Sequence, residues 1–245
     1  LGLHEAGALG SVVTMLGFRN AQAVDQSLRL VPGPLRTRLR KELLRRSWDL
    51  PDGVPFHAYP WREMFRTIPR RLGVAKRLGY DERAVVMRNS VWLDSMVARH
   101  HLDNIDAVYG YEDMAASTFA AAKARRVSCL YDLPIMHYAS SRRIMQEEIA
   151  LWPEMRRYLE GVEDPPAKLA RKDKELELAD HVFVASSLTR NSLTAIGYPT
   201  ERISVIPYGS PTNYFKPAPR TDDTFRAIFV GLVGPRKGVH YLLKA

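Results

Sequence analysis

At 245 residues, with 46% hydrophobic and 26% charged residues, the chain has the composition of a globular protein with a substantial core. Its single cysteine, Cys129, excludes a disulfide framework and favours a reducing compartment, where a buried structural thiol is expected. Neither a transmembrane run of about 18 apolar residues nor a signal peptide is visible, so a cytoplasmic location is expected. The net charge of +9 is uneven, because residues 1–100 contain 17 Lys and Arg against 9 Asp and Glu.

The first hundred residues combine a short strand with basic helical patterns. A helix end followed by Gly7 leads to a predicted strand near 11–16. The segment 35–48, LRTRLRKELLRRSW, has leucines at four-residue spacing and predicts a basic amphipathic helix. The segment 61–77 is also basic, with apolar residues at helical spacing. The pattern over 81–101 predicts a long helix.

From residue 105 onward, strand and helix patterns alternate. The predicted strands are 105–111, 127–134, 181–187, 202–209 and 225–231, and the predicted helices are 112–126, 140–160, 166–179 and 187–197. The polar, proline-rich segment 211–224 is typical of a linker. This alternation predicts an α/β protein with a parallel sheet covered on both faces.

Common catalytic signatures do not match the chain. The glycines near the end differ from the dinucleotide fingerprint, and the phosphate loop GxxxxGK[ST] does not occur. The seven histidines show no tight metal-ligand spacing, so no metal site is expected. A nucleophile elbow, G-x-S-x-G, is also missing from the sequence.

The order of motifs over 175–245 is more specific. It runs ELELAD-HVFVASS, a helix to Gly197, RISVIPYGSP, NYFKP and then FVGLVGPRKGVHYLLKA. This order resembles the retaining glycosyltransferases of family 4, which have the two-domain GT-B fold. The likeness is weaker over 105–137 and is only in outline over 1–104.

The resemblance implies a Rossmann-like acceptor domain over 1–210, a linker over 211–224, and the first β-α unit of a nucleotide-sugar domain over 225–245. It implies a hexosyltransferase-like enzyme that moves a sugar from a nucleotide-sugar donor to an acceptor hydroxyl with retention of configuration and without a cofactor. The acceptor is expected to be a saccharide or a lipid-linked molecule. The family's first strand and its later glutamate pair are not found in these residues. We therefore expect this chain to be incomplete and inactive alone.

The donor diphosphate is expected to meet the loop before the last helix. There, Arg236 and Lys237 are adjacent cations that could stabilise the charge of the departing diphosphate without a metal. Many family members have an arginine directly after the strand-end glycine, where this chain has Leu232. The positive charge that binds the donor diphosphate is therefore expected to come from Arg236 and Lys237.

Candidate acceptor-side residues follow two predicted strands. Tyr111 and Glu112 come at the end of one strand and Asp132 at the end of the next, where ligands bind in open α/β sheets. The resemblance points to His137 as a histidine facing the reaction centre. Two other roles stay open: a loop histidine without function for His137, and a helix-terminal acid for Glu112.

The basic segments 35–48 and 61–77 have three interpretations. They are solvated helix faces, contacts to the anionic inner face of a membrane, or nucleic-acid contacts. Nucleic acid is disfavoured because no aromatic stacking platform or recognition module accompanies the charge. The second hypothesis for the protein is therefore a non-catalytic, basic, peripheral membrane module with a GT-B-like domain. A different GT-B enzyme, such as an epimerase or a phosphorylase, is a third.

Overall fold

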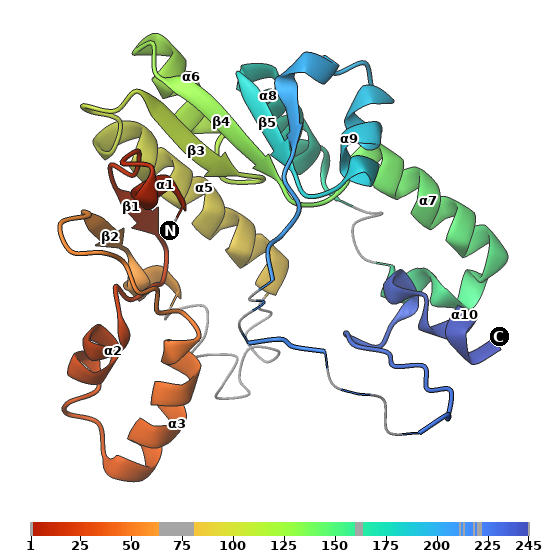
Figure 1. Cartoon of the computed structure of the whole chain (residues 1–245). Coiled ribbons are helices and arrows are strands. Elements are labelled where there is room, and N and C mark those ends of the chain that lie inside the picture. The colour runs from red at the N-terminus through yellow and green to blue at the C-terminus, as the bar shows by residue number, and fades with distance from the viewer. Residues whose placement is uncertain are drawn as a thin grey trace. The chain divides into compact units, whose positions relative to one another are not determined.

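A computed structural model of the chain describes residues 2–63, 81–159, 164–210, 212, 214–217, 219 and 222–244 (Figure 1). Most of the predicted basic helix 61–77 lies outside these residues. The contacts divide the chain into two compact units. The first is Leu1–Val108 with Asp113–Cys129, and the second is Tyr109–Glu112 with Leu130–Ala245. The predicted linker over 211–224 stays a prediction.

The first unit contains two short paired strands and several helices. Strands β1 (Val12–Thr14) and β2 (Phe56–Ala58) pair in parallel. The helices are α1 (Gly2–Glu5), α2 (Ala21–Ser27), α3 (Gly33–Leu44), α5 (Glu82–His100) and α6 (Ala116–Ala124). The predicted early strand, basic helix and long helix are thus confirmed. Cys129 is fully buried, as expected.

A four-stranded sheet has the order β3-β4-β5-β6. Its strands are β3 (Ala107–Tyr111), β4 (Ser128–Leu133), β5 (His181–Val184) and β6 (Ile203–Val205). Strand β5 pairs in parallel with β4, where Leu130 lies opposite His181, and with β6, where Val182 lies opposite Ile203. This confirms a mixed α/β fold with parallel strands, compatible with a Rossmann-like fold.

The expectation that the sheet is covered on both faces stays a prediction, because one face is only partly covered in the described strands. In β5, Val182 and Val184 are buried, whereas the alternating residues His181 and Phe183 are only half-buried. Residues Tyr109 and Tyr111 of β3 are exposed. Successive side chains of a strand point to opposite faces, so this period of two describes one closed face and one more open face, on which Asp132 of β4 is nevertheless buried. The open face carries aromatic and polar side chains.

The second unit contains helices α7 (Tyr138–Leu151), α8 (Pro166–Leu178) and α9 (Ser187–Thr194), together with the 3-10 turns η1 (Pro153–Tyr158) and η2 (Thr200–Arg202). Helix α9 packs against β5 and β6 (Figure 1). As predicted, Ser186 caps α9 by accepting a hydrogen bond from the Thr189 amide, and Gly197 follows its end with a φ of 82°. The predicted helix 140–160 ends earlier, because Pro153 cannot continue an α-helix.

The predicted strand over 225–231 does not form. The backbone there has no regular secondary structure, and Phe225, Ile228 and Val230 are each more than 80% exposed. A strand is stable only when a neighbour satisfies its backbone groups, and none of the described residues pairs with this segment. The alternation of apolar residues alone therefore predicted the wrong secondary structure for this segment.

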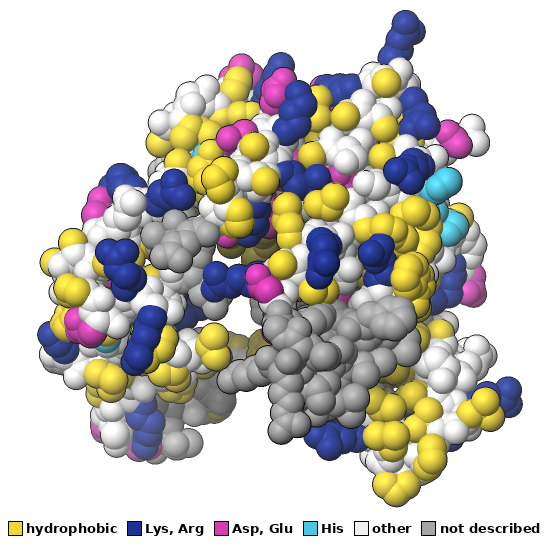
Figure 2. Space-filling model, turned by 180° about the vertical axis from the view of Figure 1, so that it is seen from behind, with side chains coloured by type: hydrophobic (Ala, Val, Ile, Leu, Met, Phe, Trp, Pro, Cys, Tyr) yellow, Lys and Arg dark blue, Asp and Glu magenta, His cyan; other side chains and the backbone are white. Residues whose placement is uncertain are grey.

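The surface mixes charged and hydrophobic side chains. On the face drawn in Figure 2, Lys and Arg are scattered among hydrophobic and acidic residues and do not gather into one patch. Among the described helices, none is long and apolar enough to cross a membrane.

Helices α5 and α6 lie against each other, and a buried carboxylate joins them. Asp94 of α5 is fully buried and accepts hydrogen bonds from the amides of Ser117 (2.7 Å) and Thr118 (2.8 Å). The Thr118 hydroxyl returns a bond to the Asp94 carbonyl at 3.0 Å. The residue at the start of α6, Ala115, has no capping side chain, so Asp94 satisfies amides that helix α6 leaves free.

We expect Asp94→Ala to lower the free energy of unfolding by about 2–4 kcal/mol, because two buried amides lose their acceptor. The matched control is Asp81→Ala, which removes the exposed cap of α5 and should cost about 1 kcal/mol. Urea unfolding followed by circular dichroism measures both. Equal losses for the two variants would contradict the buried role.

Candidate functional site

The predicted acceptor-side residues come together at the carboxyl ends of β3 and β4. Tyr111 ends β3 and Glu112 follows it, while Asp132 is the fifth residue of β4. The Glu112 amide donates to the Asp132 carbonyl at 3.2 Å. The parallel sheet thus gathers these side chains at one edge, which is where ligands bind in open α/β sheets.

Glu112 forms a buried ion pair. Its Oε1 lies 2.7 Å from Lys172 Nζ of α8, and the side chains are 9% and 7% exposed, respectively. Charged groups this deep in a protein are almost always paired, since an isolated buried charge is costly. Helix α6 begins only at Ala116 and uses Asp94 as its cap. Glu112 therefore does not act as an acid at the amino end of α6.

Two tyrosines of β3 stand beside Asp132 on the open face of the sheet. The Tyr109 hydroxyl donates to Asp132 Oδ2 at 2.8 Å. Burial, followed by the bond to Asp132, raises the pKa of Tyr109 well above its usual range. Burial and the nearby Asp132 charge also raise the pKa of Tyr111. Both phenols therefore stay protonated and can donate hydrogen bonds at neutral pH, while about half of the Tyr111 side chain remains exposed.

His137 lies at the amino end of α7 and is 4% exposed. Its Nδ1 accepts a bond from the Ala139 amide at 3.3 Å, and its own amide donates to Ser192 Oγ at 2.8 Å. Because Nδ1 is an acceptor, the neutral ring carries its proton on Nε2. Nε2 is buried and has no hydrogen-bond partner among the described residues.

Asp173 of α8 lies next to the unsatisfied histidine nitrogen. Its Oδ1 is 3.9 Å from His137 Nε2, and the Tyr138 hydroxyl donates to both Asp173 oxygens at 2.9 and 3.0 Å. Burial lowers the pKa of His137; the Asp173 charge opposes this shift and the Lys172 charge adds to it. The imidazole is therefore neutral at pH 7 and presents an N–H donor beside a carboxylate.

A second buried network supports the same helix. The hydroxyl of Tyr131, in β4, donates to Glu175 Oε2 at 2.9 Å, and Arg171 Nε lies 3.5 Å from Glu175 Oε1. Tyr131 and Glu175 are both fully buried. Such satisfied polar contacts fix α8 against the sheet and thereby fix Lys172 and Asp173.

Sequence reasoning missed the contribution of α8. The signal was available, because Leu169, Lys172, Leu176 and Ala179 share one face at helical spacing, and a lysine in an otherwise apolar stripe needs a buried partner. The sequence alone, however, does not show which acidic residue is the partner of Lys172. Glu112 is 60 residues away along the chain.

The predicted donor residues lie in a separate place. Arg236 and Lys237 belong to the 3-10 turn η3 (Pro235–Lys237), which precedes α10 (Val239–Lys244). Gly238 joins the two with a φ of 68°, a conformation that favours glycine. Both cations are exposed, and neither forms an ion pair within the described part of the chain. They are free to bind an anion.

Helix α10 packs against the carboxyl end of α7. His240 Nε2 lies 3.7 Å from Glu148 Oε2, and the Tyr241 hydroxyl donates to the same carboxylate. His137 is at the other end of α7, which has 14 residues and is therefore about 21 Å long. The structure thus brings the acceptor-side candidates together but does not bring Arg236 and Lys237 to them.

No protein-family model, curated protein or solved structure matches this chain. Within the described ranges, no group of three His, Cys, Asp or Glu side chains could hold a metal ion. What the site offers is a set of carboxylates, phenols and a neutral imidazole N–H. These groups recognise hydroxyl-bearing ligands by hydrogen bonding.

The neutral state of buried His137 predicts a pH-dependent stability. Its pKa lies below the ordinary 6.5, so below that pH the unfolded chain binds more protons than the folded chain. The contribution of neutral His137 to the free energy of unfolding is therefore present above pH 6.5 and is lost as the pH falls through the folded-state pKa. We expect the stability of the natural protein to fall relative to His137→Asn between pH 7.5 and 5. Asparagine keeps a helix-capping acceptor, and urea unfolding at each pH measures the difference. A difference that is constant with pH would contradict a depressed pKa.

Proposed function

We propose that the protein is a GT-B-type retaining glycosyltransferase that moves a sugar from a nucleotide-sugar donor to an acceptor hydroxyl. The observation that carries the proposal is that Tyr111, Glu112 and Asp132 lie at one sheet edge, while α8 contacts both Glu112, through Lys172, and His137, through Asp173. This arrangement occurs in a chain whose motifs over 175–245 follow the order of family-4 enzymes. The catalysis would be electrostatic and positional and would need no metal.

The open tyrosine face supports a polyhydroxyl acceptor such as a saccharide. Tyr109 and Tyr111 have ring centroids 6.0 Å apart at an interplanar angle of 81°, so they offer two differently oriented aromatic surfaces. The carbon–hydrogen face of a sugar packs on such rings, while the phenols and Asp132 hydrogen-bond its hydroxyl groups. A lipid-linked saccharide would present the same chemistry.

His137 is the proposed catalytic residue. Its buried Nε2–H would donate to an oxygen of the reacting sugar or acceptor, and the depressed pKa keeps the ring neutral for this role. The nitrogen is shielded in this structure, with Asp173 and the Tyr138 ring next to it. The role therefore requires Asp173 or Tyr138 to move when the substrate binds.

Arg236 and Lys237 are proposed to hold the donor diphosphate. Two exposed cations on one tight turn, without an ion partner among the described residues, suit an anion that gains charge as the glycosidic bond to the donor breaks. Transfer needs donor and acceptor in one site. The proposal therefore requires η3 and α10 to leave the carboxyl end of α7 and approach the acceptor residues.

We expect the gene product that contains these residues to release nucleoside diphosphate from at least one nucleotide sugar when a saccharide or lipid-linked acceptor is present. Lys237→Met should lower kcat/KM by about 100-fold or more, because the transition-state charge loses a partner. Lys216→Met, at an exposed position of the proline-rich segment, is the matched control. Nuclear magnetic resonance of the product gives its anomeric configuration. Turnover of Lys237→Met equal to the control, or an inverted product, would overturn the proposal.

A second candidate function, a basic membrane-surface module, is favoured by α3. This helix buries none of its residues, and its Leu35 is 52% exposed among basic side chains. Exposed leucines next to Lys and Arg suit the surface of an anionic bilayer.

We expect charge reversal at Arg36, Arg38 and Lys41 to abolish co-sedimentation with phosphatidylglycerol vesicles if α3 contacts membranes, since each cation contributes about 1 kcal/mol near an anionic surface. Vesicles of phosphatidylcholine alone are the control lipid. Binding that survives the reversal, or that is insensitive to salt, would reject this role for α3.

A further inference from the structure

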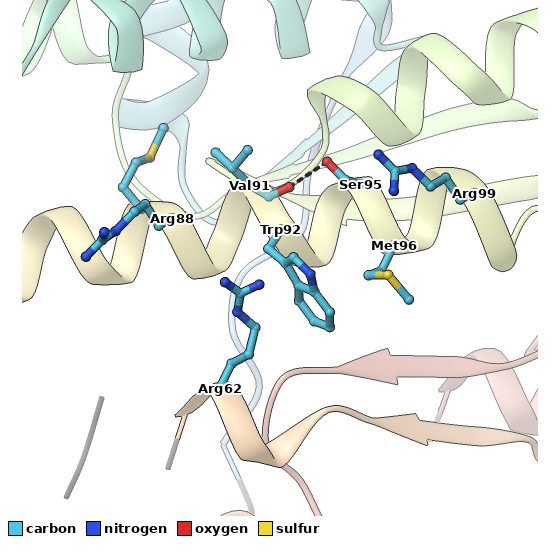
Figure 3. A pocket seen from close by; sticks show the side chains of 8 residues that line it. Arg62, Arg88, Val91, Trp92, Ser95, Met96 and Arg99 are labelled. Carbon is cyan, nitrogen blue, oxygen red and sulfur yellow. Dashed lines mark hydrogen bonds between the residues drawn. The ribbon is translucent and has the colours of Figure 1, made fainter. Parts of the chain in front are cut away.

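A pocket of about 450 Å³ lies along α5, and none of the residues of the candidate site line it (Figure 3). One wall is Arg62, and the remaining lining residues all belong to α5. All of them lie within the first compact unit. The volume is in the range of pockets that bind small organic ligands.

The lining follows from helical periodicity. Arg88, Trp92, Met96 and Arg99 are spaced by three or four residues, which places them along one stripe of the helix. Arg88 and Arg99 lie at the two ends of the stripe, eleven residues and therefore about 16 Å apart along the axis. The pocket is thus elongated, with a cation toward each end.

Three arginines give the pocket a positive charge that the described residues do not neutralise. Arg88 and Arg99 are exposed and form no ion pair or hydrogen bond in the described ranges. The guanidinium of Arg62 lies 4.7 Å from the centroid of the Trp92 ring and 5.4 Å from that of Trp61. These cation–π contacts position Arg62 at the wall without removing its charge.

Between the cations the wall is apolar. It is formed by Val91, Trp92 and methionines, and flexible methionine side chains adapt to ligands of varied shape. Ser95 adds little polarity, because its hydroxyl donates back to the Val91 carbonyl of the same helix at 2.9 Å (Figure 3).

We propose that this pocket binds an amphiphilic anion, a molecule with a phosphate or carboxylate head and an aliphatic chain. A bare anion would leave the apolar wall in water, whereas a neutral hydrophobic ligand would leave three arginines without a counter-charge. The head lies between Arg62, whose guanidinium covers the Trp92 ring, and Arg88, which lies four residues before Trp92 on α5. The chain runs over Val91 and Met96 toward Arg99. This site is independent of the proposed sugar transfer.

Octyl phosphate, below its micelle-forming concentration, is the probe. We expect calorimetry to show binding at least 50-fold tighter than that of inorganic phosphate, because each buried methylene strengthens binding about fourfold. Octyl glucoside has the same chain without the charge and should bind at least tenfold more weakly than octyl phosphate. Equal binding of octyl phosphate and inorganic phosphate, or of octyl phosphate and octyl glucoside, would overturn the proposal.

Substitutions locate the site. Arg88→Gln and the double variant Arg62→Gln with Arg88→Gln should weaken octyl phosphate binding by about 10-fold and 100-fold. Arg29→Gln removes the same charge from an exposed position after α2 and should leave binding unchanged. Arg88 is exposed, so its single substitution tests the site without endangering the fold. A pocket variant that binds like Arg29→Gln would also overturn the proposal.

The same variants identify the source of the ligand. If Arg88→Gln also weakens binding to phosphatidylglycerol vesicles, the occupant is a membrane lipid. If it weakens only octyl phosphate binding, the occupant is a soluble amphiphile. Both results support the pocket and leave the transferase assay unaffected.

Discussion

The ion pair between Glu112 and Lys172 connects the carboxyl end of β3 to helix α8, and the rest of the candidate site depends on it. The two charges are 2.7 Å apart and almost fully removed from water. Removing one partner from such a pair leaves an uncompensated charge and typically costs about 3–5 kcal/mol. The pair therefore fixes the position of α8, and with it the carboxylate of Asp173 that faces His137.

Helix α8 has a double function in this arrangement. Its buried side carries Glu175, which accepts the Tyr131 hydroxyl and anchors the helix to β4. Its half-exposed side carries Asp173, which binds Tyr138 and lies beside the histidine nitrogen. The buried contacts fix the backbone of α8, whereas the Asp173 side chain is 55% exposed, and the proposed role of His137 requires movement of that side chain or of Tyr138.

Cations that have no ion partner in the described part of the chain occur in two other regions, and each region has a different environment. Arg236 and Lys237 stand on a short exposed turn, and the proposal assigns them a strongly hydrated anion such as a diphosphate. Arg88 and Arg99 flank an apolar strip of α5, which suits an anion attached to a hydrocarbon. The exposed cations of the described residues thus lie in different local environments, and the two proposals assign them different anions on that basis.

The sequence by itself determined the alternation of strands and helices, the serine cap of α9 and the meeting of Glu112 with Asp132 at one sheet edge. These features depend on local periodicity, on capping chemistry and on the rule that parallel strands end at the same edge. Only the tertiary structure decided that Lys172 is the partner of Glu112, that Asp94 caps α6 and that 225–231 is not a strand. Each of these depends on which distant residues become neighbours, and the energy of a buried charge, a free amide or an unpaired strand is set by those neighbours.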